Sequence, residues 1–403
     1  MPRPVLLAWE LGAGRGHILA LAEIARALEA RGYDVVYAVQ RLDTLRAASV
    51  DSSRGGHFQA PIWPGLLGAS GFGLPGPQAT LGDVLADLGL RSREVTEYAL
   101  AGWDTIFSNV RPSAVVADFS PMCLLAARAR IPALARGNGF TLPPAHLETF
   151  PMLRPEQQNR KYDEQVLLET LNGALRASGR HPIDRLPAVF SADRMCVAGF
   201  AEIDPYATER RISYVAPFLP SWRPNVREEG NEIFVYLPEY IHAYPTILAA
   251  LENVAAAGSV VRFHAPNLDH AIARRLTSAG IVVEREPVPL ESIAQRSRLI
   301  VSHGGYGTSS FSLAAGVPQV VIAFDTEKLL TGAALEKLGV GRLVRIQRDN
   351  PLEVALLAQL ILEAHADDQL AERARSLAPG FLARMQEDPA KQAADQVVEI
   401  AAG

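Results

Sequence analysis

The sequence predicts an α/β protein built from two doubly wound domains of parallel strands. Short apolar runs alternate with segments of helical spacing along both halves of the chain, and a proline-rich stretch near residue 215 separates the halves. A glycine-rich loop follows an apolar run in each half. Alternation of this kind favours a parallel sheet with helices on both faces. The length of 403 residues also exceeds what one hydrophobic core usually holds.

In the first half, the spacing of apolar residues defines the expected elements. Residues 5–9 form a short apolar run, and the segment from Ile18 to Leu28 has apolar residues at helical spacing until Gly32 ends it. The further strands expected in this half are residues 35–39, 115–117 and 131–135, with a helix over residues 122–130. These elements predict a first domain over residues 1–215.

The second domain is expected over residues 216–377. The stretch 214–231 contains three prolines followed by charged residues, a composition typical of a linker. The strands expected after it are residues 233–237, 260–264, 281–284, 299–302 and 319–323, with helices over residues 245–257 and 270–279. The tail from residue 351 is expected to be helical, with an interruption at the Pro-Gly-Phe of residues 379–381.

The composition excludes several classes of function. A net charge of −5 with 48% hydrophobic and 21% charged residues is typical of a globular protein, and nothing in it indicates a nucleic-acid partner. Cys123 and Cys196 fit neither a zinc-site spacing nor a disulfide framework, which favours buried thiols in a reducing compartment. No signal-peptide pattern opens the chain, and no apolar run approaches the about 18 residues of a membrane helix. We therefore expect a cytoplasmic, soluble protein with no membrane span.

The first glycine-rich loop, residues 12–17, nearly matches the dinucleotide-binding pattern G-x-G-x-x-G. A nicotinamide or flavin oxidoreductase would need a third glycine at the last position and an acidic residue at the end of the second strand. His17 occupies that last position, and Asp43 lies several residues beyond the second strand. The pattern therefore disfavours an oxidoreductase and indicates a loop that presents a histidine.

Polar groups follow the expected strands in both halves. In open parallel sheets, ligands bind at the carboxyl ends of the strands. The segments that follow strands here are residues 12–17, Asp118, residues 303–310 and residues 324–329. We therefore expect a binding site at the sheet edge of each domain.

The second glycine-rich loop, residues 303–310, has the features of a phosphate site. Its three glycines let a ligand approach the backbone, and Thr308, Ser309 and Ser310 supply hydroxyls where a helix begins. A helix N-terminus offers N–H groups and a positive dipole end that suit an anion. The loop lacks the G-x-x-x-x-G-K-[ST] pattern of an ATPase. The alternative is a glycine-rich turn that only packs a helix on the sheet.

The segment "HGGYGTSSFSLAAGVPQVVIAFDTEKLLTGAALEKLGVG" resembles the donor-binding signature of family 1 glycosyltransferases, the UDP-glycosyltransferase and macrolide/rhamnosyl transferase group. "PVPLESIAQRSRLIVSHGG", "GRGHI" and "VVADFSPMCLLAARARIPAL" resemble further parts of that family. The resemblance implies a GT-B fold, with two Rossmann-like domains facing a cleft. It assigns the acceptor to residues 1–215 and the nucleotide sugar to residues 216–377. It also implies that a C-terminal helix over about residues 378–403 packs back on the first domain.

The resemblance implies catalytic roles for His17 and Asp118. His17 matches the family's general base, which takes the proton of the acceptor hydroxyl, and a histidine has a pKa suited to that step. Asp118 matches the carboxylate that orients this histidine. The alternatives are that His17 only caps or packs a helix, and that Asp118 is the N-cap of the helix at Pro121.

The resemblance also assigns donor contacts in the second domain. The residues that match the diphosphate cradle are His303, Gly304, Gly305, Gly307, Thr308 and Ser309. Val288 matches the position next to the nucleobase, and Glu327 and Lys328 match the pair that contacts the sugar hydroxyls. Lys328 replaces a glutamine of the family pattern, and it donates but cannot accept a hydrogen bond.

Two further departures concern the donor. Phe311 stands where many UDP-specific members carry a ribose-binding glutamate, which leaves UDP and dTDP both open as the nucleotide. Glu239, in "VYLPEYIHAY", would bring a carboxylate to the phosphate region, where the family has Gly-Ser.

These observations predict an inverting, metal-independent glycosyltransferase that needs no cofactor besides the nucleotide sugar. The acceptor is expected to be an apolar small molecule or lipid hydroxyl that contacts residues 57–82, a segment rich in Gly, Pro and large apolar groups. The alternative is that residues 57–82 only form an ordered surface loop on the core. Two other functions stay open: a sugar-nucleotide epimerase that uses Glu239 and Glu327, and a binding protein with a degenerate donor site.

Overall fold

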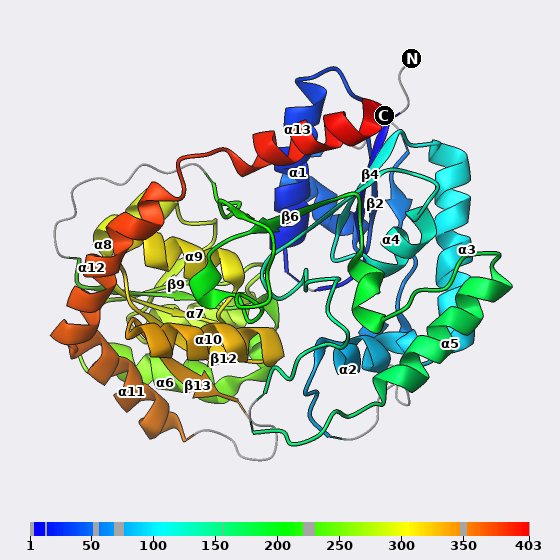
Figure 1. Ribbon diagram of the computed structural model, residues 1–403. Coiled ribbons are helices and arrows are strands. Elements are labelled where there is room, and N and C mark those ends of the chain that lie inside the picture. The colour runs from blue at the N-terminus through cyan, green and yellow to red at the C-terminus, as the bar shows by residue number, and fades with distance from the viewer. Residues whose placement is uncertain are drawn as a thin grey trace. The chain divides into compact units, whose positions relative to one another are not determined.

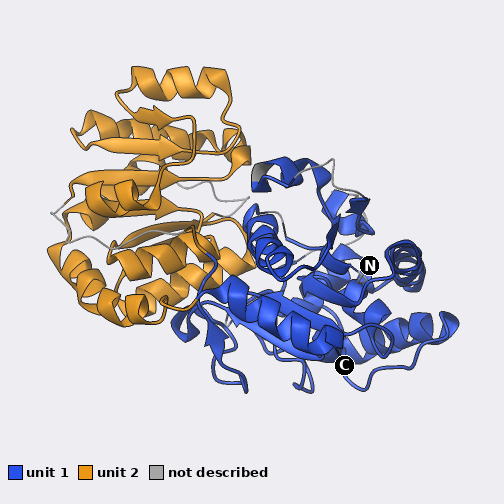
Figure 2. Cartoon of the chain, turned by 90° about the horizontal axis from the view of Figure 1, so that it is seen from above, with its two compact units in different colours: residues 1–218, 388–403 blue, residues 219–387 orange. Residues whose placement is uncertain are grey.

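The structure is a computed structural model that describes residues 4–12, 14–50, 56–67, 76–154, 156–220, 230–346 and 353–402. The chain divides into two compact units (Figure 2). Unit 1 comprises residues 1–218 and 388–403, and unit 2 comprises residues 219–387. Each unit contains a parallel sheet with helices packed on it, which confirms the predicted α/β class.

The sheet of unit 1 is doubly wound. Its strands are β1 (Val5–Trp9), β2 (Val35–Val39), β3 (Phe58–Gln59), β4 (Ala114–Asp118), β5 (Ala133–Gly137), β6 (Arg194–Ala198) and β7 (Tyr214–Val215). They lie in the order β3-β2-β1-β4-β5-β6-β7, and all neighbouring pairs are parallel. The chain turns outward in opposite directions from β1 and β4, so the switch point lies between them, with Trp9 in register with Asp118. Ligands of doubly wound sheets bind at such a point.

Helices and short turns cover the unit 1 sheet. The helices are α1 (Gly16–Glu29), α2 (Leu81–Leu85), α3 (Arg93–Val110), α4 (Pro121–Ala127), α5 (Glu164–Ala177) and α13 (Pro389–Ala402). The shorter turns are η1 (Leu42–Ala48), η2 (Pro64–Leu67), η3 (Ala86–Leu90), η4 (Leu186–Phe190) and η5 (Ala201–Ile203). α1 turns the face with Ile18, Leu21 and Leu28 into the core because these residues share one side of a 3.6-residue helix.

The C-terminal helix α13 completes unit 1. It lies beside α1 (Figure 1) and buries Ala393, Ala394 and Val397 in the same core cluster as the α1 residues. Arg31, just after α1, donates to Asp395 with an Nε–Oδ1 distance of 3.1 Å. The end of the chain thus belongs to the first unit, although about 170 residues of unit 2 precede it.

The unit boundaries differ from the predicted ones. Unit 1 ends at Phe218 instead of residue 215, and the chain returns to it at Asp388 instead of about residue 378. Residues 378–383 continue α12 (Asp368–Ala383), which packs on α9 (Tyr306–Ala315) in unit 2. Pro379 lies inside this helix, so the expected interruption was wrong. The burial of Ala378 and Phe381 holds the segment helical across the proline, where propensity alone predicts a break.

The sheet of unit 2 repeats the same topology. Its strands are β8 (Glu232–Tyr236), β9 (Val261–His264), β10 (Val282–Glu284), β11 (Ser297–Ser302), β12 (Gln319–Ala323) and β13 (Gly341–Arg345), in the order β10-β9-β8-β11-β12-β13. The switch point lies between β8 and β11. The helices are η6 (Glu239–Ala243), α6 (Pro245–Ala256), α7 (His270–Ser278), α8 (Leu290–Arg296), α9 (Tyr306–Ala315), α10 (Thr326–Leu338) and α11 (Val354–Ala366), besides α12.

Successive residues of β8 pack into different hydrophobic clusters. Ile233 and Val235 belong to a cluster that includes residues of α6 and α11, whereas Phe234 belongs to a second cluster with Phe311 and Ile300. This period of two explains why the strand is an unbroken apolar run: both faces of a doubly wound sheet are covered.

The sequence patterns did not predict the strands that contain both polar and apolar residues. β3, β6, β7 and β13 were not predicted, and β6 shows why, since Arg194 is exposed while residues 196–198 are buried. α4 ends at Ala127 rather than near residue 130, and Ala129 beyond it has a φ of +58°. Within the described ranges, no helix is long and apolar enough to cross a membrane.

Candidate functional site

Unit 1 brings His17 and Asp118 together at its switch point. Nδ1 of His17, in the first turn of α1, lies 3.0 Å from Oδ1 of Asp118, the last residue of β4. The Asp118 side chain is fully buried, and that of His17 is 15% exposed. Strand β1 lies next to β4 and leads into α1, so the topology itself places the histidine over the end of β4.

The charge of Asp118 determines which ring nitrogen of His17 carries the proton. Burial opposes ionisation of Asp118, but the nearby Arg136 guanidinium and His17 outweigh it and hold the pKa of the carboxyl below its ordinary value. An ionised carboxylate only accepts hydrogen bonds, so Nδ1 of His17 is the donor. In the neutral ring, Nε2 therefore keeps its lone pair and can accept a proton.

Aromatic rings and a glycine hold the His17 ring in place. The Trp9 ring stacks on it with a centroid distance of 5.3 Å, and the Phe119 ring lies 6.4 Å away. Phe119 has a φ of +44°, a conformation that costs a residue other than glycine about 1–3 kcal/mol. Gly12 has a φ of +90°, and a Cβ there would collide with Nε2 of His17. Glycine at position 12 therefore leaves room for the nitrogen that is available as a base.

Arg136 contacts the His17–Asp118 pair through Asp118, and the sequence patterns missed it. It lies near the end of β5, is buried, and donates through Nη1 to Oδ2 of Asp118. Its guanidinium carbon also lies 4.5 Å from the centre of the Phe218 ring. The available signal was a charged residue inside the apolar run "ALARG".

The structure contradicts the alternative for Asp118 as a helix cap. The N-cap of α4 is Ser120, and its side chain makes no capping bond. The Asp118 carboxylate is instead shared between His17 and Arg136.

Unit 2 places the second glycine-rich loop between β11 and α9. Gly304 has a φ of +80°, and a Cβ there would lie 2.6 Å from Cγ1 of Val321. Its N–H donates to Oγ of Ser302 at 3.0 Å. α9 begins directly after Gly305, which has no side chain to cap the helix. Gly307 and Thr308 are part of the first turn of α9, whose N–H groups suit an anion.

Two hydroxyls of this loop are turned into the core. Ser309 and Ser310 are fully buried, and Oγ of Ser309 donates to Oε1 of Gln319 at 3.4 Å. Ser302 donates to the same oxygen at 3.0 Å. Ser309 therefore helps to hold α9 on β12, and its hydroxyl is engaged inside the protein. Only Thr308 of the three hydroxyl residues stays partly exposed.

Glu327 and Lys328 lie beside the first residues of the glycine loop, His303 and Gly304. Lys328, in the first turn of α10, contacts Oε2 of Glu327 at 2.5 Å, and a Cβ at Gly304 would lie 3.3 Å from the Lys328 carbonyl oxygen. Burial opposes the charge of Lys328, but Glu327 and Asp325 outweigh it and raise its pKa. Burial, followed by the charge of Lys328, lowers the pKa of His303 to about 4. His303 is therefore neutral near pH 7, and Lys328 carries the positive charge.

Val288 and Glu239, which were also singled out around the donor site, lie in different places: Val288 packs near Phe311, and Glu239 follows β8. Val288 and Tyr236 both pack against the cluster in which Phe311 is buried. The Tyr236 ring stacks on His264 with an interplanar angle of 6°, and its centroid lies 5.6 Å from that of His303.

Glu239 opens the turn η6, which follows β8 at the switch point. Its Oε2 accepts from Asn267 at a distance of 3.1 Å.

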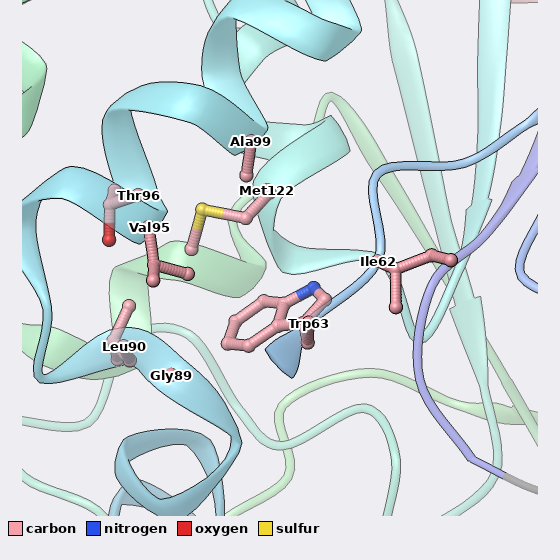
Figure 3. Close-up of a pocket in the computed structure, with 8 residues that line it drawn as sticks. All are labelled: Ile62, Trp63, Gly89, Leu90, Val95, Thr96, Ala99 and Met122. Atoms are coloured by element: carbon pink, nitrogen blue, oxygen red, sulfur yellow. The ribbon is translucent and has the colours of Figure 1, made fainter. Parts of the chain in front are cut away.

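The segment 57–82 is described only in part, because residues 68–75 lie outside the described residues. Ile62 and Trp63 from this segment line a small, mainly apolar pocket with residues of η3, α3 and α4 (Figure 3). In the described ranges of the chain, no three His, Cys, Asp or Glu side chains are placed to hold a metal ion.

Comparisons with known proteins show which proteins this chain resembles. Residues 268–398 match the family model of the erythromycin biosynthesis protein CIII-like C-terminal domain. A PGL/p-HBAD biosynthesis glycosyltransferase of Mycobacterium tuberculosis is 35% identical over 95 residues, which are 23% of this chain and 22% of that protein. An uncharacterized UDP-glucosyltransferase, YojK, of Bacillus subtilis is 29% identical over 247 residues, 58% of each chain. The matches thus span between about a fifth and three fifths of these two relatives.

Solved structures extend the likeness to the whole chain. The glycosyltransferase VinC, solved in complex with dTDP, superposes with a TM-score of 0.64 at 16% identity over 99% of each chain. At this identity the comparison establishes the fold. The chain therefore has the GT-B fold of glycosyltransferases, and its residues 268–398 match the model of the erythromycin biosynthesis protein CIII-like C-terminal domain.

Proposed function

We propose that the protein is an inverting glycosyltransferase that moves a sugar from a UDP or dTDP sugar to a hydroxyl of an apolar small molecule or lipid. The hydrogen bond between Nδ1 of His17 and Asp118 carries this proposal. Because Nδ1 is bonded to Asp118, Nε2 of the His17 ring is available as a base at the switch point of unit 1. The acceptor hydroxyl gives its proton to Nε2 while its oxygen attacks the anomeric carbon, and the bond from that carbon to the diphosphate breaks.

The residues around His17 assist the proton transfer. When Nε2 takes the proton, the ring becomes an imidazolium, and the buried Asp118 carboxylate stabilises its charge. Arg136 keeps Asp118 ionised, so the carboxylate does not take the proton itself. Trp9 and Phe119 restrict the ring to one plane.

The leaving diphosphate would bind at the start of α9. The glycine loop supplies N–H groups of the first helical turn, and Lys328 supplies a positive charge next to it. With these groups, the proposed reaction needs neither a metal ion nor a cofactor besides the nucleotide sugar. VinC binds dTDP, and YojK is named as a UDP-glucosyltransferase, which supports a donor of this class without choosing between the bases.

His17→Ala tests the catalytic assignment. We expect transfer to fall about 10²–10⁴-fold, the usual contribution of a general base. The affinity for UDP or dTDP, measured by calorimetry, should stay unchanged because those contacts lie in unit 2. The matched control is His181→Ala, which removes an exposed histidine of the same unit. A His17→Ala enzyme that transfers sugar at the wild-type rate would refute the assignment.

A thermal-shift panel of nucleotides and nucleotide sugars tests the donor. A ligand that binds the native state raises Tm by mass action, so the pattern of shifts identifies the base and the sugar. The rate after treatment with EDTA tests metal independence and should not change. Formation of an epimeric nucleotide sugar without acceptor would favour an epimerase instead, and no shift with any nucleotide would favour a degenerate donor site.

A further inference from the structure

A row of paired strand residues places a charged pair on one covered face of the unit 1 sheet. Trp9 on β1 pairs with Asp118 on β4, Asp118 pairs with Arg136 on β5, and Arg136 pairs with Cys196 on β6. Paired residues of neighbouring strands share a face, because successive residues of a strand alternate between faces. Trp9 and Cys196 belong to the hydrophobic cluster that contains residues of α1 and α13. Asp118 and Arg136 therefore lie side by side on the face covered by α1, the helix of His17.

The Arg136 guanidinium is buried but not fully hydrogen-bonded. The side chain is 8% exposed, and Nη1 donates to Oδ2 of Asp118. Its Nε is buried and has no hydrogen-bond partner within the described ranges of the chain. A buried donor without a partner lowers stability, and apolar residues can often replace a buried ion pair without loss. These observations favour a role for Arg136 in the site over a role in the stability of the fold.

Phe218 makes the second contact of Arg136. The guanidinium carbon lies 4.5 Å from the centre of the Phe218 ring, which is a cation–π geometry. Phe218 is half-buried and packs against the same hydrophobic cluster as Trp9 and Cys196. It is also the last residue of unit 1 before the chain enters unit 2 at Leu219. The segment at which the chain leaves unit 1 thus contacts the partner of Asp118.

We propose that Arg136 and Phe218 are positioning residues for the base: Phe218 holds the guanidinium against Asp118, and the guanidinium fixes the carboxylate so that Oδ1 accepts from Nδ1 of His17. This inference rests on the proposed function, because it needs His17 to act as the base. Both residues act through Asp118.

The ionisation of Asp118 decides where the neutral His17 ring carries its proton. An ionised carboxylate only accepts, so the proton is on Nδ1 and Nε2 keeps its lone pair. A protonated carboxyl would donate to Nδ1 instead, and the ring proton would then be on Nε2, where it blocks the base. Burial opposes ionisation of Asp118, but Arg136, followed by His17, outweighs it and holds the pKa of the carboxyl below its ordinary value. Without Arg136, this pKa should rise and the blocked form should persist to higher pH.

The other titratable groups on this face are uncharged near pH 7. Burial raises the pKa of the Cys196 thiol to about 11, and it also raises the pKa of the Tyr37 phenol well above its ordinary value. The residues that α13 buries in the same cluster do not titrate; they are Ala390, Ala393, Ala394 and Val397. The charge state of Asp118 therefore depends on Arg136 and His17.

Arg136→Gln removes the charge and keeps a side chain that can donate a hydrogen bond. We measure kcat against pH at saturating substrates, and Tm, for this variant and the wild type. Below about pH 7, kcat should fall about 10–10³-fold, the range in which an adjacent guanidinium shifts the ionisation of a carboxyl. The lost rate should return as pH rises, because Asp118 then ionises. Arg136→Lys keeps the charge, so it should restore the wild-type pH profile, although with a lower kcat because lysine lacks the planar guanidinium.

Phe218→Leu tests the contact at the ring. It removes the cation–π contact and keeps an apolar side chain, so kcat should fall about fivefold. Its pH profile should move in the same direction as that of Arg136→Gln, but by less. The matched control is Phe381→Leu in unit 2, where the guanidinium carbon of Arg384 lies 4.6 Å from the ring centre. This control should lower Tm and leave the pH profile of kcat unchanged.

NMR of the ring nitrogens of labelled histidine gives a readout that does not depend on sugar transfer. In the wild type, the proton of the neutral His17 ring should be on Nδ1. In Arg136→Gln, it should be on Nε2 at the pH values at which kcat is lost, and Phe381→Leu should leave it on Nδ1.

Two results would overturn the inference. If Arg136→Gln lowers Tm but keeps the wild-type pH profile and the Nδ1 proton, Arg136 only stabilises the fold. If Phe218→Leu keeps the wild-type kcat and pH profile, Phe218 does not hold the guanidinium. Should Arg136→Gln fail to fold, Arg136→Lys and Phe218→Leu still give the comparison. A wild-type enzyme that transfers no sugar to any acceptor refutes the proposed function instead, and the NMR readout then still tests the inference, so the two failures are distinguishable.

Discussion

Gly12→Ala tests whether the position of the His17 ring sets the rate of transfer. The added Cβ would overlap Nε2 of His17 and would lie 3.1 Å from Cε1 and 3.2 Å from Cδ2. Carbon atoms in ordinary contact are about 3.5–4.0 Å apart, so the whole ring has to retreat. The ring stacks with Trp9 and Phe119 and is hydrogen-bonded to Asp118, so a retreat breaks contacts that hold Nε2 in place.

The structure gives a magnitude for this change. A displacement of about 1 Å at a reacting group costs roughly 10²-fold in rate, so we expect kcat to fall about 10²-fold. The φ of +90° adds strain for alanine, and we expect the free energy of unfolding to fall by about 1–2 kcal/mol. The affinity for the nucleotide should stay at its wild-type value because the glycine loop of unit 2 is untouched.

Gly14→Ala is the matched control in the same loop. A Cβ at Gly14 would meet only the backbone nitrogen of Gly16, at 3.9 Å. Initial rates at saturating donor and acceptor, with urea unfolding of each variant, separate the loss of rate from the loss of stability. A Gly12→Ala enzyme with the wild-type kcat, or a Gly14→Ala enzyme that is equally impaired, would refute the reasoning.

Two further predictions concern charge. His303 should remain neutral from about pH 5 to pH 8, since burial and Lys328 lower its pKa to about 4. Lys328→Met should raise the pKa of His303 only in part, because burial is the larger cause. Titration of the imidazole by NMR would measure this rise. An unchanged pKa of His303 in Lys328→Met would contradict the electrostatic effect of Lys328 on His303. The second prediction is a pH dependence of stability. The pKa of Glu10 is about 7 in the folded protein and 4.5 as its ordinary value, so its contribution to stability is fully present below 4.5 and is lost as pH rises to about 7. The loss amounts to about 3 kcal/mol. The free energy of unfolding of the wild type minus that of Glu10→Gln should fall across this window, and a flat difference would contradict the prediction. Asp118 acts in the opposite sense, because its pKa is lowered, and its contribution is lost at low pH.

The sequence alone determined most of the strands and helices and the sheet edges where their polar residues gather. Residues 5–9, 35–39 and 319–323 were predicted as strands with the observed bounds, because buried parallel strands are short apolar runs. His17, Asp118 and His303 follow such strands or end them, so the rule for doubly wound sheets placed them at the switch points. The glycine loops were recognisable from their spacing because each loop needs particular backbone conformations at fixed positions. Such conformations are local properties of the chain.

Only the tertiary structure decided which side chains meet. Arg136 pairs with Asp118 from a neighbouring strand, and Glu10 gathers N–H groups from Trp63, Trp103 and the start of α4. Ser309 has the same hydroxyl as Thr308 but points to Gln319, since the rotation of α9 on the sheet decides which face is buried. Local patterns record the period of a helix or strand. Partners distant in the sequence are selected by packing and by the need of buried polar groups for a hydrogen bond, which no single segment encodes.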